Sequence, residues 1–161
     1  MRTILAIDPG TATTGYAILQ ISRRNSNPKL VSYGCIITTA KTPLPKRLAI
    51  LAKDLRSLIS RFHPQELAVE ELFFAKNVKT GTAVGQARGV ILLIGAEKKL
   101  KIAEYKPVEI KLAVTGYGQA PKKQIQRMVK TILGLETRPR PDDAADAIAL
   151  GLCHLQTRKF E

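Results

Sequence analysis

Residues 3–21, which read TILAIDPGTATTGYAILQI, decide the fold. The apolar run at 3–8 ends in a Pro-Gly pair, which is typical of a buried strand followed by a turn. A second run at 15–21 is partly alternating, and a third follows at 30–38 after the polar link 22–28. Together these segments predict an antiparallel meander of three strands.

The rest of the chain alternates between helical and strand patterns. Apolar residues with helical spacing, extended apolar runs and turn residues predict helices at 45–62, 80–98, 108–114, 122–133 and 142 to about 156, with strands at 66–73 and 101–105. A strand, a helix and a further strand in this order imply a parallel pairing through a right-handed crossover. We therefore expect one α/β domain over residues 1–161, with a mixed five-stranded sheet flanked by helices.

The charge balance is unusual for a chain with an ordinary core. Its 161 residues are 45% hydrophobic but include 26 Lys and Arg against 13 Asp and Glu, a net charge of +13. The composition excludes a disordered chain, a collagen and a disulfide scaffold. The excess of positive charge favours a polyanionic partner. Contact with anionic lipid and simple solubility are the alternatives, and no apolar run approaches the roughly 18 residues that span a bilayer.

The two cysteines, Cys35 and Cys153, lie far apart without metal-ligand spacing. This pattern is typical of small core side chains in a reducing compartment. The chain also enters its first strand directly after Met1, with no signal-peptide pattern. A cytoplasmic protein is therefore expected.

Carboxylates stand at unusual places on the apolar framework. Asp8 closes the first strand, and Glu70 and Glu71 interrupt a later one, whereas Asp143 and Asp146 open a helix rich in Ala and Leu. Buried carboxylates are unfavourable unless they are paired or bound to a cation. Residues 143 and 146 are neighbours on one helix face. Their positions predict convergence on one metal site, and oxygen donors without His or Cys favour Mg²⁺, or Mn²⁺ in its place.

Each acid also has an ordinary structural explanation. Asp8 could form a turn before Pro9, Asp143 could complement a helix dipole, and Asp142 is expected to be an N-cap rather than a ligand. Alternation along the strand cannot choose between Glu70 and Glu71. Of the two histidines, His154 lies too far along its helix to join the acids, and His63 precedes a proline.

Four short motifs together resemble the RuvC family of bacterial Holliday-junction resolvases. They are IDPG at 7–10 with TGY at 14–16, VEELFFAKN at 69–77, GQARG at 85–89 and DDAADA at 142–147. The resemblance runs from about residue 2 to 157. It implies a ribonuclease H-like fold, a homodimer, a bacterial cytoplasmic location and coupling to the RuvA–RuvB branch-migration complex. It also selects Glu70 over Glu71, so that the catalytic and metal-binding acids would be Asp8, Glu70, Asp143 and Asp146, holding two Mg²⁺ ions per subunit.

The same resemblance suggests residues that contact DNA. The expected set comprises Phe73, Phe74, Lys76, Asn77, Lys79, Lys111, Lys122 and Lys123. An exposed phenylalanine beside lysines can stack on an unpaired base, and either of the first two could be the ring that wedges into the junction, with family position favouring Phe73. Lys111 and Lys122 fall where the family has active-site lysines, which would offset charge on the reacting phosphate. The lysines of residues 98–130 form a broader basic region.

The resemblance implies a crossover junction endodeoxyribonuclease that nicks two opposed strands of a four-way DNA junction, during recombination and repair, and leaves 5′-phosphate ends; the acids and the basic surface agree with this expectation. The alternative enzyme is a related ribonuclease H-like nuclease that acts on RNA or other branched nucleic acid. An ATP-using phosphotransferase is disfavoured, because two copies of such a fold are needed to enclose a nucleotide. A non-catalytic junction-binding module is disfavoured by the four acids. The glycine-bearing helix at 80–98 is the candidate dimer surface.

Overall fold

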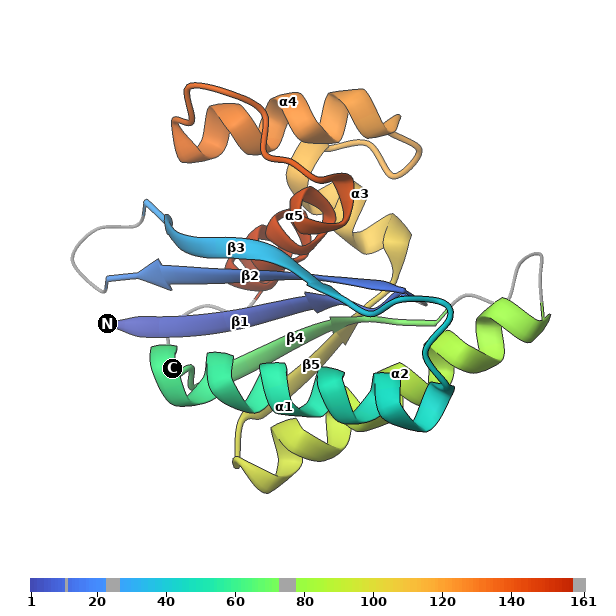
Figure 1. The fold of residues 1–161 in the computed structure, drawn as a ribbon. Helices are drawn as coiled ribbons and strands as arrows, with labels where there is room; N and C mark the ends of the chain where they lie inside the picture. Colours follow the sequence, from blue (N-terminus) through green and yellow to red (C-terminus); the bar gives the residue numbers. More distant parts are fainter. Residues whose placement is uncertain (11, 23–26, 73–77, 158–161) are drawn as a thin grey trace.

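The computed structural model describes residues 1–10, 12–22, 27–72 and 78–157. In Figure 1 a central sheet lies between two layers of helices. The strands are β1 (Arg2–Asp8), β2 (Thr13–Ile21), β3 (Lys29–Ile37), β4 (Glu66–Glu70) and β5 (Lys101–Tyr105). The helices are α1 (Leu44–Phe62), α2 (Val78–Glu97), α3 (Pro107–Thr115), α4 (Lys122–Leu133) and α5 (Asp142–Thr157).

The sheet has the strand order β3-β2-β1-β4-β5. The first three strands pair antiparallel, whereas β4 pairs parallel to both β1 and β5. This is the expected meander followed by parallel strands, with α1 and α2 in the connections that lead to β4 and β5. The parallel strands β1 and β4 end at the same edge of the sheet, so Asp8 and Glu70 lie beside one another there.

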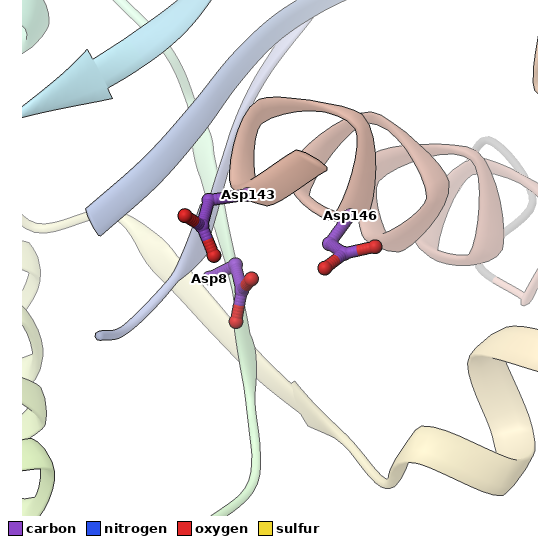
Figure 2. Close-up of side chains that lie close together, drawn as sticks. All are labelled: Asp8, Asp143 and Asp146. Carbon is purple, nitrogen blue, oxygen red and sulfur yellow. The ribbon is translucent and has the colours of Figure 1, made fainter. Parts of the chain in front are cut away.

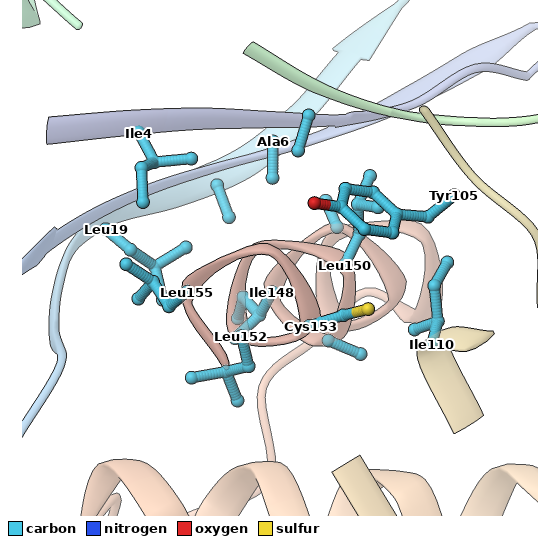
Figure 3. Packing of buried hydrophobic residues seen from close by; sticks show 14 of the residues in the cluster. Ile4, Ala6, Leu19, Tyr105, Ile110, Ile148, Leu150, Leu152, Cys153 and Leu155 are labelled. Atoms are coloured by element: carbon cyan, nitrogen blue, oxygen red, sulfur yellow. The ribbon is translucent and has the colours of Figure 1, made fainter. Parts of the chain in front are cut away.

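Each face of the sheet has its own hydrophobic core. One core joins α1 and α2 to the face that carries Leu5, Ile7 and Val69. The other joins α3, α4 and α5 to the face that carries Ile4 and Ala68, and part of it is shown in Figure 3. Helix α5 is buried from Ala147 through Leu155 because the sheet covers one side and α3 and α4 cover another. A helix that is covered on several sides must be apolar nearly all round, as the Ala- and Leu-rich sequence of α5 is.

The predicted elements are confirmed, with shifts at their ends. The largest shift is in β4, which was expected to reach residue 73 and ends at Glu70. Helix α1 ends where His63 takes a left-handed conformation, directly before Pro64. Among the described residues, no helix combines the length and apolar character needed to cross a membrane.

Candidate metal centre

Three aspartates from the two ends of the chain meet at the edge where β1 stops. Asp8 is the last residue of β1, and Asp143 and Asp146 project from the first turns of α5, as Figure 2 shows. Each offers one carboxylate oxygen, and these oxygens lie within 4.8 Å of one another. Asp143 and Asp146 are therefore neighbours on α5, as their i,i+3 spacing predicts, and both lie close to Asp8.

Glu70 completes the acidic group from β4. Ala68 packs toward α5 and Val69 packs toward α1 and α2, so alternation along β4 turns Glu70 toward α5. Its carboxyl group is hydrogen-bonded to that of Asp8. Glu71 follows the end of β4, and it is Glu70 that contacts Asp8.

Crowding of the carboxyl groups changes their acidity. Burial, followed by the charge and hydrogen bond of Glu70 and the charges of Asp146 and Asp143, raises the pKa of Asp8 to about 9. Burial also raises the pKa of Asp146, against the opposing charge of Lys122. The pKa of Glu70 is raised by burial and by Asp146, although the hydrogen bond with Asp8 and the charge of Lys111 oppose this. In the absence of a cation, this arrangement disfavours the fully ionised state.

A divalent cation would remove that penalty. The donors are carboxylate oxygens without nitrogen or sulfur, which is the set that Mg²⁺ and Mn²⁺ prefer over zinc. Close carboxylates whose mutual repulsion disfavours ionisation are also what an oxygen-coordinated cation neutralises. The residues present therefore fit a magnesium-type site.

Two lysines border the acids, as expected. The Lys122 Nζ lies 3.4 Å from an Asp146 oxygen and 3.4 Å from an Asp142 oxygen. Burial opposes its protonation, but the two aspartates outweigh this effect and raise the pKa of Lys122. Lys111, on α3, lies close enough to Glu70 for its charge to lower the pKa of that acid. Lys123 is exposed on α4.

The expectation that Asp142 is an N-cap is wrong. The Pro141 carbonyl already accepts hydrogen bonds from the amides of Ala144 and Ala145, so Pro141 is the cap and Asp142 is the first helical residue. The Asp142 side chain instead accepts a hydrogen bond from Gln126 at 3.1 Å and pairs with Lys122. It therefore links α5 to α4.

The expectation for the cysteines holds only for Cys153, which is buried. Cys35 is partly exposed on β3, opposite Gly15 of β2, and it faces the start of α5. Burial and the charges of Asp143 and Asp8 raise the pKa of its thiol. It is a neighbour of the acidic group rather than a core residue.

Several expected DNA contacts cannot be compared with the structure. Phe73, Phe74, Lys76 and Asn77 lie outside the described residues, as does the side chain of Lys79. Part of the broader basic region lies elsewhere: Lys98 and Lys99 follow α2, and Lys101 starts β5. These three are at the opposite end of the parallel strands from Asp8 and Glu70. Among the lysines whose side chains the structure describes, Lys111 of α3 and Lys122 of α4 interact with the acids.

A buried polar network lies farther along α5 and was missed by the sequence analysis. His154 is fully buried, donates from Nε2 to Glu66 at 2.6 Å, and has its Nδ1 2.9 Å from the Tyr105 hydroxyl. Arg2 pairs with the same Glu66 carboxylate. The signal in the sequence was Glu66 at the start of an apolar strand and a histidine within an apolar helix. Glu66 and His154 are 88 positions apart, so their spacing in the sequence could not show that they are in contact.

The family model for crossover junction endodeoxyribonuclease RuvC matches residues 4–154. The chain belongs to the RuvC family. Its sequence is 54% identical over 151 residues to the RuvC of Moorella thermoacetica, covering 94% of this chain and 89% of that protein. It is 49% identical over 158 residues to the RuvC of Finegoldia magna, covering 98% and 95%.

A solved RuvC structure confirms the ribonuclease H-like fold. The structure of T. thermophilus RuvC in complex with Holliday junction substrate superposes with a TM-score of 0.89 at 30% identity, covering 96% of this chain and 93% of that one. The RuvC resemblance inferred from the four motifs is thus confirmed. The protein is an endonuclease of the crossover junction class.

Proposed function

We propose that the protein is a Holliday-junction resolvase, a Mg²⁺-dependent endonuclease that nicks two opposed strands of a four-way DNA junction during homologous recombination and DNA repair. The observation that carries the proposal is the meeting of Asp8, Asp143 and Asp146 within 4.8 Å in a RuvC-family chain. The net charge of +13 supports a DNA substrate. Membership of the RuvC family supports a bacterial cytoplasmic location and an association with the RuvA–RuvB branch-migration complex.

Asp8, Glu70, Asp143 and Asp146 would hold the metal, two Mg²⁺ ions per subunit, with Mn²⁺ able to substitute. When bound, such ions activate a water for attack on a phosphodiester and stabilise the leaving oxygen. If the water oxygen bonds to phosphorus while the bond from phosphorus to the 3′ oxygen breaks, the products carry a 5′-phosphate and a 3′-hydroxyl. The four acids come from three elements, β1, β4 and α5, so their relative placement depends on how α5 packs on the sheet.

Lys111 and Lys122 would balance charge at the reacting phosphate. Lys122 is already paired with Asp146 at 3.4 Å, and Lys111 acts on Glu70. A cation that is held in place before the substrate binds stabilises charge that develops in the transition state. Lys123 would contact the DNA backbone beside them. Phe73 and Phe74, with Lys76, Asn77 and Lys79, would contact the junction, one ring entering between unpaired bases.

A homodimer would supply the two active sites that two opposed nicks need. Helix α2 supports this role because its outward face is uncharged along Thr82, Gln86, Gly89 and Leu93, and Leu93 is 58% exposed. A helix that faces solvent normally carries charged side chains on its outward face, and these four positions of α2 carry none. The sheet covers one side of α2, and the α2 of a second copy would cover the other.

The test compares a synthetic mobile four-way junction with single-stranded RNA as substrates, both with Mg²⁺. The wild type should cut the junction symmetrically, and Asp8→Asn should not cut it. Asp54→Asn is the matched control, since it removes one carboxylate from α1 on the opposite face of the sheet and should cut normally. Preferred cleavage of RNA would favour the alternative, a related nuclease for RNA or other branched nucleic acid. Equal cutting by the wild type and Asp8→Asn would refute the metal site.

A further inference from the structure

Arg88 is the only charged residue between positions 80 and 96, in the middle of α2. Its side chain is 18% exposed. A charge that is largely removed from water is costly unless it is paired and hydrogen-bonded. The surroundings of its guanidinium therefore explain why the otherwise uncharged middle of α2 carries this one arginine.

The guanidinium joins α2 to the ends of two strands. Its Nε donates to the carbonyl oxygen of Glu70 at 3.3 Å, and its Nη2 pairs with the carboxylate of Glu104 on β5. The planar fork of an arginine holds two acceptors in a fixed relative geometry, which a lysine cannot do.

The carbonyl that Arg88 holds belongs to a residue of the acidic group. Glu70 is the last residue of β4, and the next backbone bond toward β5 comes from Glu71 to Tyr105 at 2.8 Å. The hydrogen bond from Arg88 restrains the peptide plane that follows the Glu70 Cα. Because the side chain leaves from the same Cα, this restraint also limits where the Glu70 carboxylate lies relative to Asp8.

We propose that Arg88 is a positioning residue that holds the Glu70 carboxylate in place for metal binding and couples its position to that of α2. This inference rests on the proposed function, in which Glu70 binds metal and α2 forms the dimer surface. Groups that orient a metal ligand typically change metal affinity or activity by about 10–100-fold when removed. A shift of α2 on dimer formation would reach Glu70 through this guanidinium.

A second ion pair on α2 supplies a matched control. Arg56 of α1 pairs with Glu97 at 3.3 Å, and both side chains are about half exposed, at 49% and 48%. This pair also joins α2 to a neighbouring element, but neither residue touches the acidic group among the described contacts. Arg56→Gln thus removes an ion pair from α2 without altering the support of Glu70.

The experiment compares wild type, Arg88→Gln, Arg88→Lys and Arg56→Gln. It measures the Mg²⁺ concentration for half-maximal cleavage of bound junction, the Mg²⁺-induced rise in melting temperature, and junction affinity in EDTA. Arg88→Gln should need about tenfold more Mg²⁺ in both metal assays, with junction affinity within about twofold of wild type. The Mg²⁺ requirement of Arg88→Lys should fall between those of the wild type and Arg88→Gln, since lysine keeps the charge but not the planar fork. Arg56→Gln should match the wild type.

Two outcomes would overturn the inference. One is a Mg²⁺ requirement of Arg88→Gln within twofold of wild type. The other is a change of equal size in Arg56→Gln, which would mean that α2 packing in general sets the requirement. If the wild type does not cut junctions, the proposed function fails, and the melting-temperature assay still reports whether Arg88 affects metal binding.

Discussion

Adding a single methyl group at Gly15 should displace the start of α5 and reduce cleavage. Gly15 pairs with Asp8 across β1 and β2, and the α5 backbone passes directly over it. A Cβ at this position would lie 1.9 Å from the Asp143 carbonyl oxygen and 2.4 Å from its carbonyl carbon, whereas real Cβ contacts essentially never fall below 3.0 Å. Both obstructing atoms are backbone, so the strand and the helix must separate.

The size of the effect follows from this geometry. Separation by about 1 Å moves Asp143 away from Asp8, and misplacement of about 1 Å at a reacting centre can cost about 100-fold in rate. This corresponds to about 2.7 kcal/mol of transition-state stabilisation. The assay is single-turnover cleavage of a saturated four-way junction by Gly15→Ala, with Mg²⁺ varied so that loss of metal affinity is seen separately from loss of rate.

Gly151→Ala is the matched control on the same helix. Its added Cβ would lie 2.3 Å from the Leu19 Cδ1, which is the end of a side chain rather than backbone. Overpacking of this kind costs about 1–3 kcal/mol of stability, but it does not displace the α5 backbone beside the acids. Cleavage by folded Gly151→Ala should therefore stay within about threefold of wild type. The reasoning is refuted if Gly15→Ala cuts at the wild-type rate, or if both variants lose the same fraction of activity.

Three further predictions concern charge. Without metal, the free energy of unfolding should fall as pH rises from about 4 toward 9. The reason is that the pKa of Asp8 is raised from 3.8 to about 9, so the folded protein keeps this proton after the unfolded chain has lost it. In thermal melts at several pH values, Asp8→Asn should reduce this fall, and Mg²⁺ should stabilise the wild type but not the variant. Arg2 and His154 lower the pKa of Glu66 although burial opposes this, so the contribution of Glu66 to folding stability is complete above pH 4.5 and is lost as pH falls through the lowered pKa. Glu66→Gln should reduce the free energy of unfolding in urea at pH 7 by about 3 kcal/mol, and an unchanged midpoint would contradict the prediction. Junction affinity in EDTA should fall steeply between about 50 and 200 mM salt, whereas cleavage of already bound junction should depend mainly on Mg²⁺; fluorescence anisotropy and single-turnover cleavage measure the two separately.

The elements and the acidic group were predictable because both leave short-range marks in the sequence. Asp8 and Glu70 interrupt or close apolar strands, and Asp143 and Asp146 have helical spacing, so each acid stands out against its neighbours. Strand ends are less strongly marked. The residues of β4 before Glu70 are buried on both faces of the strand, so the hydrophobic pattern alone could not show which of Glu70 and Glu71 faces the site.

Contacts between distant segments left no such mark. The Glu66–His154 bond joins positions 88 residues apart, and the closeness of Gly15 to Asp143 depends on how α5 crosses the sheet. A glycine in the TGY motif was visible, but a turn would explain it equally well from sequence alone. Cys35 was predicted to be a core residue because its contacts with the start of α5 are also long-range and cannot be seen from the sequence of β3.

These distant contacts hold the two ends of α5 by different means. At the start, the Asp143 backbone rests against Gly15, where there is no side chain to hold it away. Twelve residues beyond Asp142, His154 ties the helix to Glu66 of β4 and Tyr105 of β5. A helix held at two points roughly 16–18 Å apart can neither slide nor tilt freely. Burial and the charges of its neighbours disfavour ionisation of Asp8. In the proposed function, restraint of α5 at these two points would keep the acids close enough to share a cation.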